Sequence, residues 1–256
     1  MNLIEKLQLE IIRYTLKANA HLAPRIESMS VHAQGKNLHD SQFLIEINKS
    51  LLDKSKSQLR QDLFVLSELN FKKNGFFVEF GATNGIDFSN SHLLEKEYGW
   101  RGILAEPAKL WHQDLIANRT AIIDTRCVWR ETGRTLMFNE TEAPELSTLN
   151  SHINSDLHAQ ERQKCSQYSV ETVSLIDLLI QHNAPNEIDY LSIDTEGSEY
   201  EILEKFDFNR FQFNIITCEH NYSSSRDKMF RLLIQKGYQR IYQKISQFDD
   251  WYIKIK

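Results

Sequence analysis

Cysteine is scarce in this sequence, and its few occurrences are widely separated. The 256 residues include 3 cysteines, which are Cys127, Cys165 and Cys218. An odd number of cysteines without the close pairs of a metal finger argues against a secreted disulfide scaffold and against a structural zinc site. We therefore expect free thiols and a location in the cytoplasm.

A surplus of positive charge is also missing. The chain has 30 Lys and Arg against 35 Asp and Glu, which gives a formal net charge of -5 at pH 7. Proteins whose main partner is a nucleic acid usually display a basic surface. The composition therefore favours a small-molecule or glycan substrate over a nucleic acid.

Long apolar runs are absent as well, including near the N-terminus. Charged residues interrupt the segment MNLIEKLQLEIIRYTLKANA, so it matches neither a signal sequence nor a membrane span. Its Ile4, Leu7, Ile11 and Tyr14 nevertheless fall on one face of a helix. We expect no transmembrane segment and a helix that packs on its own domain or forms a homodimer, with attachment to a membrane surface as the weaker alternative.

The hydrophobic residues that are present suffice for a substantial core, at 41% of the chain. From about residue 75, short apolar runs alternate with amphipathic stretches, which is typical of β-α-β units and a mostly parallel sheet. The length allows one such α/β domain with a small extension. We predict a helical N-terminal appendage over residues 1–55 and a cofactor-binding domain over residues 56–256.

Five apolar runs are predicted to form the parallel strands. They are Phe76–Phe80, Gly102–Glu106, Ala121–Arg126, Ile188–Asp194 and Phe213–Glu219. In open α/β sheets the ligand binds at the carboxyl ends of such strands. A polar stretch around residues 145–164 predicts a lid over the substrate, and the terminal runs GYQRIYQ and FDDWYIKIK predict a hairpin that adds one antiparallel strand.

The first two predicted strands carry the features of a nucleoside-binding site. Glu79 ends the first strand and precedes Gly81 and Gly85, after which we expect a helix to begin near Phe88. Glycines allow the backbone to approach a ligand closely, and the carboxylate can accept a hydrogen bond from the ammonium group of S-adenosylmethionine. Glu106 ends the second strand, where an acidic side chain can bind both ribose hydroxyls.

A nicotinamide cofactor is the main alternative ligand for such a turn. Its pyrophosphate favours a third glycine, in the pattern Gly-x-Gly-x-x-Gly, and disfavours a nearby carboxylate. This sequence lacks the third glycine and carries Glu79. The pattern therefore favours S-adenosylmethionine over NAD.

Four blocks of the sequence match a known pattern. They are SQLRQD from Ser57, FVEFGATNG, FSNSHLLEKEYGWRGILAEP and DYLSIDTEGSEYEIL, which lie between residues 57 and 221. Through these blocks the chain resembles the FkbM family of methyltransferases. The resemblance implies a Rossmann-like methyltransferase fold with a mostly parallel seven-stranded sheet and a C-terminal antiparallel hairpin strand. It also implies S-adenosylmethionine as the methyl donor and O-methylation, commonly of sugars in glycans or on natural products.

The departures from the family pattern are conservative. Glu79 stands where the family often has aspartate, Asn84 where aspartate is common, and Ser91 where threonine is frequent. The cofactor prediction is therefore unchanged. The full set of candidates for the cofactor site is Gln61, Asp62, Glu79, Gly81, Gly85, Ser89, Asn90, Glu106, Pro107, Cys127 and Asp194.

Candidates for the reaction centre follow the fourth and fifth predicted strands. An alcohol is a poor nucleophile while protonated, so a base must take its proton or a metal must stabilise the alkoxide. In one mechanism His220 is the base and is oriented by Glu219 or Glu196. In the other, Asp194, Glu219 and Asn221 bind a divalent cation such as Mg²⁺, in a layout similar to that of catechol O-methyltransferases.

A helix-capping role is the structural alternative for Asp194 and Glu196. Ser198 and Glu201 already form the pattern of a capping box for the next helix. The two carboxylates are therefore available for chemistry.

We predict an S-adenosylmethionine-dependent O-methyltransferase that acts on a hydroxyl, most simply of a sugar in a glycan or glycosylated metabolite. A polyketide, lipid or amine acceptor is the alternative within the same enzyme class. A non-catalytic adenosyl-binding module is the alternative outside it, and the acidic residues of the reaction centre argue against that function.

Overall fold

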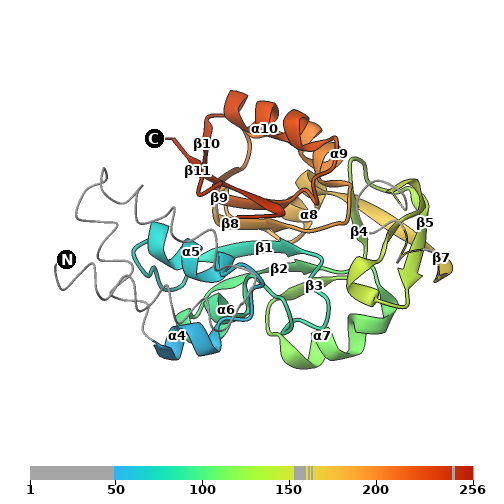
Figure 1. Ribbon diagram of the computed structural model, residues 1–256, viewed down its shortest axis with the longest axis horizontal. Coiled ribbons are helices and arrows are strands. Elements are labelled where there is room, and N and C mark those ends of the chain that lie inside the picture. The colour runs from blue at the N-terminus through green and yellow to red at the C-terminus, as the bar shows by residue number, and fades with distance from the viewer. Residues whose placement is uncertain (1–48, 153–159, 161, 163, 244–245, 256) are drawn as a thin grey trace.

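A seven-stranded sheet forms the centre of the computed structural model, which describes residues 49–152, 160, 162, 164–243 and 246–255 (Figure 1). The strand order is β10-β11-β9-β8-β1-β2-β3. The bounds are β1 Phe76–Phe80, β2 Arg101–Ala105, β3 Ile122–Asp124, β8 Glu187–Ile193, β9 Gln212–Glu219, β10 Tyr238–Ile241 and β11 Asp249–Lys254. All five strands predicted to be parallel are present, and β11 is the antiparallel strand that the terminal hairpin predicted.

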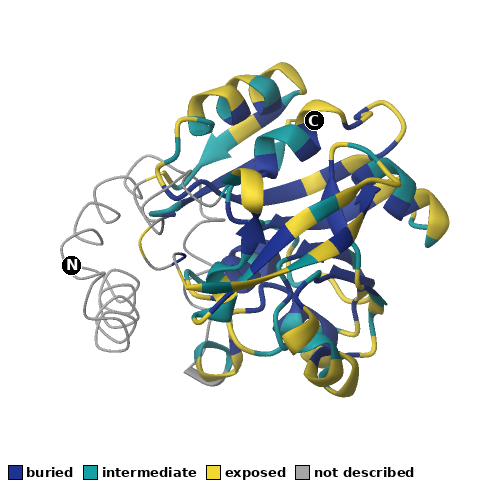
Figure 2. Ribbon diagram, turned by 90° about the vertical axis from the view of Figure 1, so that its right-hand side faces the viewer, coloured by how far each residue is buried: buried dark blue, intermediate teal, exposed yellow. Residues whose placement is uncertain are grey.

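Helices cover both faces of the sheet because neighbouring strand residues point to opposite sides. Phe77 on β1 packs in one cluster with leucines of α5 and α6, whereas Val78 packs in another with α8 and α9 (Figure 1). Figure 2 shows the strands as the buried layer between exposed helix surfaces. The helices are α4 Lys49–Lys54, α5 Gln61–Glu68, α6 His92–Tyr98, α7 His112–Asn118, α8 Leu175–Gln181, α9 Glu199–Glu204 and α10 Arg226–Gln235. This arrangement and strand order are those of the Rossmann-like methyltransferase fold that we expected.

A second sheet of four strands lies beside the central one. Its order is β4-β7-β5-β6, and β5 and β7 form its long antiparallel pair. The bounds are β4 Cys127–Trp129, β5 Thr135–Thr141, β6 Thr148–Leu149 and β7 Cys165–Ser174. The segment that joins β5 to β7 contains the predicted lid.

The N-terminal appendage falls mainly on residues that the structure does not describe. The predicted amphipathic helix with Ile4 and Tyr14 is among them, and so is most of the range 1–55. The described part of that range includes α4, whose end is joined to α6 by an ion pair between Lys54 and Glu97 at 2.6 Å. Across the described residues, none of the helices has the length and apolar character needed to span a membrane.

One helix begins later than the sequence suggested. We expected the helix after the first strand to start near Phe88, but α6 starts at His92. Phe88 has a left-handed backbone (φ 63°), which no helix interior allows. Residues 81–91 therefore form a loop, which we call the β1–α6 loop.

The point where β1 meets β8 requires a glycine. Gly81 has φ +71°, and a Cβ atom at this position would lie 2.1 Å from the carbonyl oxygen of Asp194. Both the backbone angle and the contact exclude a side chain. Gly81 thus allows the ends of the two strands to lie close together.

Gly81→Ala is expected to destabilise the protein more than Gly133→Ala does. Both glycines are left-handed, but a Cβ atom on Gly133 would meet nothing within 4 Å. The left-handed backbone alone costs about 1–2 kcal/mol, and Gly81→Ala adds the steric overlap to this. Urea unfolding of the two variants measures the difference, and equal losses of stability would show that the contact with Asp194 is unimportant.

Candidate functional site

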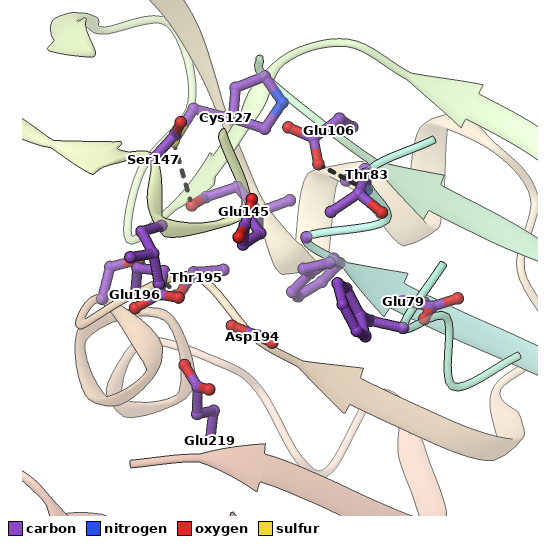
Figure 3. Close-up of a pocket in the computed structure, with 18 of the residues that line it drawn as sticks. Glu79, Thr83, Glu106, Cys127, Glu145, Ser147, Asp194, Thr195, Glu196 and Glu219 are labelled. Carbon is purple, nitrogen blue, oxygen red and sulfur yellow. Dashed lines mark hydrogen bonds between the residues drawn. The ribbon is translucent and has the colours of Figure 1, made fainter. Parts of the chain in front are cut away.

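A cavity of about 510 Å³ opens at the carboxyl ends of the central strands (Figure 3). β1 lies between β8 and β2 in the sheet. The chain therefore continues from β1 to β2 and β3 on one side, and later adds β8 and β9 on the other side of β1. Ligands of open α/β sheets bind at such a point. The cavity is lined by strand-end residues such as Gly81, Glu106, Asp194 and Glu219, and by Glu145 to Ser147 from the lid.

The carboxylate of Glu79 holds the β1–α6 loop. It accepts hydrogen bonds from the Asn90 backbone N–H at 2.6 Å, the Ser89 hydroxyl at 3.0 Å and the Ser91 hydroxyl. Only 2% of Glu79 is exposed. We expected this carboxylate to accept from a ligand ammonium, and in the structure it lines the cavity while both of its oxygens also hold the loop.

Arg119 is the positively charged partner of this loop, and no sequence pattern pointed to it. Its side chain is fully buried, lies 3.8 Å from Glu79 and donates to Glu95 at 2.8 Å. It also donates to the Gly85 carbonyl at 3.0 Å and to the Ser91 hydroxyl at 2.8 Å. The guanidinium thus joins α7 to the loop and to α6.

Glu106 faces the cavity from the end of β2. One carboxylate oxygen accepts from the Thr83 N–H and the other from the Ala108 N–H, both at 2.8 Å. Each oxygen keeps a second lone pair for a ligand. Burial raises the pKa of Glu106 to about 7, although the two N–H groups act in the opposite direction. This geometry suits a pair of neighbouring hydroxyls.

The other candidates for the cofactor site divide into two groups. Those that line the cavity, with Glu79, Glu106 and Asp194, are Gly81, Asn90, Pro107 and Cys127. Those that do not are Gln61, Asp62, Gly85 and Ser89.

The residues outside the cavity have structural contacts instead. Gln61 donates to Asp249 at 2.7 Å, and Asp62 accepts from the Ser55 hydroxyl at 2.7 Å. Gln58, in the same sequence block, lines the cavity and was not among the candidates. Gln61 and Asp62 are the first residues of α5, and their side chains are buried in the protein. Gln58 precedes this helix and lines the cavity.

Asn90 and Cys127 both line the cavity, but they differ in what they offer to a ligand. The amide nitrogen of Asn90 donates to Ser192 at 2.9 Å, whereas its amide oxygen is buried and has no partner among the described residues. Burial raises the pKa of the Cys127 thiol to about 12, so this side chain is a neutral part of the wall. Asn90 therefore offers an unused acceptor in the first half of the cavity.

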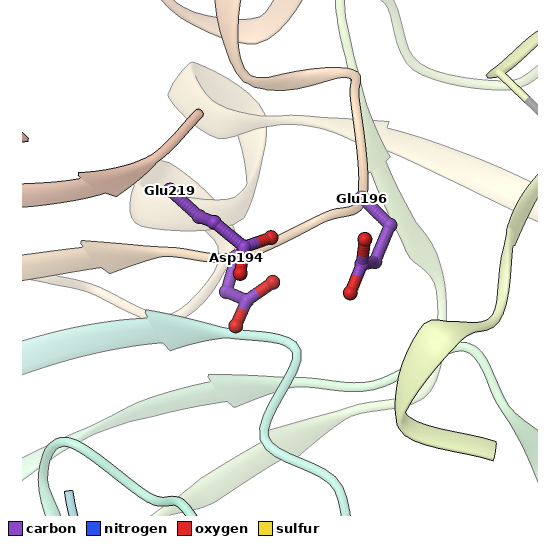
Figure 4. A group of neighbouring side chains, drawn as sticks. All are labelled: Asp194, Glu196 and Glu219. Atoms are coloured by element: carbon purple, nitrogen blue, oxygen red, sulfur yellow. The ribbon is translucent and has the colours of Figure 1, made fainter. Parts of the chain in front are cut away.

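Three carboxyl groups meet in the other half of the cavity. Asp194, Glu196 and Glu219 each place an oxygen within 4.8 Å of the other two (Figure 4). Burial, and then the negative charges of Asp194 and Glu196, hold the pKa of Glu219 well above its usual range. The side chains of Asp194 and Glu219 lie close together in this cluster.

His220 lies apart from these carboxyl groups and does not line the cavity. Its Nδ1 accepts from the Tyr222 N–H at 3.0 Å, and its Nε2 lies 3.8 Å from Asp250. Burial lowers the pKa of His220 to about 4. Glu219 and Asn221 line the cavity, whereas the His220 imidazole lies toward Asp250. The predicted base is therefore outside the reaction centre.

The predicted capping box before α9 is also wrong. Ser198 makes no capping bond, and its hydroxyl donates to Thr195 at 2.8 Å. Glu199, rather than Glu201, accepts from the backbone N–H groups of Thr195 at 3.1 Å and Gly197 at 2.9 Å. The two backbone N–H groups that donate to the buried Glu199 belong to the loop after β8, so this carboxylate holds the loop in place.

The acidic cluster does not form a ready cation site. Oxygen ligands suit Mg²⁺, but a guanidinium nitrogen of Arg162 lies 2.5 Å from Glu196, and the Asn221 amide donates to the same carboxylate at 3.2 Å. The Asn221 amide is engaged with Glu196, so of the predicted ligands Asp194, Glu219 and Asn221 only the two carboxyl groups are placed together to bind a cation.

The sequence matches the model of one protein family. A family model described as "Methyltransferase FkbM domain" matches residues 79–251. Among curated protein sequences, none matches the chain.

Solved structures of methyltransferases resemble the chain distantly. A precorrin-6y C5,15-methyltransferase from Geobacter metallireducens GS-15 is 12% identical over 70% of this chain and 71% of its own, with a TM-score of 0.37. A candidate RNA methyltransferase from Pyrococcus horikoshii is 10% identical over 77% and 82%, with a TM-score of 0.38. A candidate sarcosine dimethylglycine methyltransferase from Galdieria sulphuraria is 9% identical over 72% and 63%, with a TM-score of 0.32. Likenesses this distant carry no argument about substrates.

Glu79→Gln is expected to destabilise the protein, because it removes the charge that Arg119 and the loop hydroxyls stabilise. Hydrogen bonds to a buried charged group contribute about 1.5–3 kcal/mol. Glu142→Gln is the matched control, since Glu142 and its partner Lys164 are exposed, and such pairs contribute less than about 1 kcal/mol. Urea unfolding with amide exchange at Asn90 measures both effects, and equal behaviour of the two variants would contradict this role of Glu79.

Proposed function

The chain belongs to the FkbM family of methyltransferases, and from this premise we propose that it transfers the methyl group of S-adenosylmethionine to a hydroxyl of a sugar in a glycan or glycosylated metabolite. The family supports use of S-adenosylmethionine, while the sugar hydroxyl is the specific part of the proposal. The observation that carries it is the close pair of carboxyl groups Asp194 and Glu219, which lines one cavity together with Glu106.

The donor is proposed to lie along the ends of β1 and β2. Glu106 would accept hydrogen bonds from both ribose hydroxyls through its unused lone pairs. The free amide oxygen of Asn90 would accept from the ammonium group, a role that we first assigned to Glu79. Pro107 and Cys127 would supply uncharged wall beside the adenosine.

The chemistry is proposed to occur between the donor and the Asp194–Glu219 pair. The pair would accept the proton of the acceptor hydroxyl on an ionised carboxylate. The O–H bond breaks, the oxygen forms a bond to the methyl carbon, and the C–S bond breaks to release S-adenosylhomocysteine. His220 has no part in this step, because its imidazole faces Asp250 instead of the cavity.

The same negative charge favours a hydroxyl over an amine as acceptor. An amine beside an ionised carboxyl pair is held as its ammonium form, which has no lone pair for attack. A hydroxyl in this position has a lone pair in every state. Transfer to an amine is therefore the less favoured function.

Affinity for S-adenosylmethionine should fall as the pH drops below about 7. Protonation of Glu106, whose pKa is raised to about 7, replaces a charged acceptor of the ribose hydroxyls with a neutral one. Calorimetry at pH 6 and pH 8 should show tighter binding at pH 8. Glu106→Gln should bind more weakly by about 1.5–3 kcal/mol and lose most of this pH dependence. Unchanged affinity in this variant would contradict the position of the ribose.

Glu219→Gln and Asp194→Asn should each slow methyl transfer by about 10²–10⁴-fold, the usual contribution of a general base. Affinity for the donor should change little, because Glu106 and Asn90 are intact. The measurement is transfer to a panel of glycosides with mass detection, and His220→Gln is the control that should retain activity.

EDTA should leave activity unchanged in the same assay, since the proposed step uses the carboxyl pair as the base and Glu196 of the acidic cluster is paired with Arg162. Loss of activity in EDTA with recovery in Mg²⁺ would favour the metal mechanism instead. Full activity of Glu219→Gln would show that the pair is not the base.

A further inference from the structure

The lid lies against the reaction centre through a charged residue. We define the lid as residues 142–152, 160, 162 and 164, the described part of the segment between β5 and β7. Its Glu145, Leu146 and Ser147 line the cavity. The position of the lid therefore determines the shape of the half that the acceptor would occupy.

Arg162 is the charged residue that holds this segment. Its side chain is fully buried, which is rare for arginine. One terminal nitrogen lies 2.5 Å from the carboxylate of Glu196, and the Nε donates to the carbonyl of Leu146 at 2.9 Å. The guanidinium thus connects two parts of the lid, at Leu146 and Arg162, and connects the lid to the loop after β8.

Glu196 accepts further hydrogen bonds from the lid and from the residues after β9. Its carbonyl accepts from the Thr148 hydroxyl at 2.9 Å, and its carboxylate accepts from the Asn221 amide at 3.2 Å. Its backbone is left-handed (φ 58°), which is unfavourable for a glutamate unless its surroundings hold it there. The lid, the loop after β8 and the residues after β9 therefore meet at one carboxylate.

We propose that Arg162 and Glu196 form a latch that positions the acceptor. The latch fixes the lid wall beside the Asp194–Glu219 pair, and it does not take the proton itself, because the guanidinium occupies the Glu196 carboxylate. Both are positioning residues, and Glu196 is not the catalytic group that we expected from the sequence. This inference rests on the proposed methyl transfer, since the acceptor half is defined by that reaction.

The latch should act on the acceptor and not on the donor. The proposed donor contacts are at the ends of β1 and β2, whereas Arg162 contacts the lid and the loop after β8. The lid wall would contact the acceptor in the ground state as well as in the transition state, and loss of such uniform binding raises KM. Loss of the latch should therefore lower kcat/KM for the acceptor mainly through a higher KM.

The experiment compares Arg162→Met, Arg162→Lys and Glu196→Gln with the double variant Arg162→Met/Glu196→Gln. Each single variant should raise the KM of the acceptor about tenfold or more, with donor affinity within about twofold. The double variant should be no worse than Arg162→Met, because the two residues act as one unit. Arg134→Met is the control, since Arg134 and Glu131 form an exposed ion pair on the second sheet.

A second readout does not depend on methyl transfer. Hydrogen exchange should become faster in residues 142–152 when Arg162 or Glu196 is changed, while the β1–α6 loop and donor binding stay as in the unmodified protein. If the unmodified protein shows no transfer but the lid exchanges faster in these variants, the proposed function fails and the latch stands. Unchanged lid exchange, an unchanged acceptor KM, or additive effects in the double variant would overturn the latch. If Arg162→Met has lost donor binding because it is unfolded, Arg162→Lys, which keeps the charge, replaces it in the comparison. A raised acceptor KM with unchanged donor affinity in Arg162→Lys supports the latch, and an unchanged acceptor KM overturns it.

Discussion

The burial of Glu79 is the constraint on which the cavity depends. A carboxylate that is 2% exposed at the end of a central strand must be matched by donors and positive charge. The β1–α6 loop supplies the donors by folding back over the strand, and Arg119 supplies the charge from α7. Because the loop folds this way, it presents Phe88 and Asn90 to the cavity. The local requirement of one buried charge thus shapes the ligand site.

Strand order then separates two tasks within one cavity. β1 and β2 present Asn90 and Glu106 in one half, and β8 and β9 present Asp194 and Glu219 in the other. The two halves also differ in their charge. Glu106 is buried among backbone N–H groups, whereas Glu219 has acidic neighbours that raise its pKa further. A donor and an acceptor can therefore be held side by side by groups that titrate differently.

The sequence predicted the strands well because short apolar runs are local signals. It also predicted that Glu106, Asp194 and Glu219 lie at one edge of the sheet, because the carboxyl ends of parallel strands meet there, and all three line the cavity. It could not predict which way His220 points, since the alternation of an extended chain depends on where the strand ends. Arg119 and Arg162 were missed because their partners lie on segments far away in the sequence. Such pairs become visible only when the chain is folded.

The central claim is that the donor lies at the β1–β2 edge with its reactive sulfur facing the carboxyl pair. A crystal structure with S-adenosylhomocysteine tests this most directly. The account predicts both ribose hydroxyls within hydrogen-bond distance of the Glu106 carboxylate and the sulfur directed toward Asp194 and Glu219. A ribose bound away from Glu106, or a sulfur directed away from the pair, would contradict it.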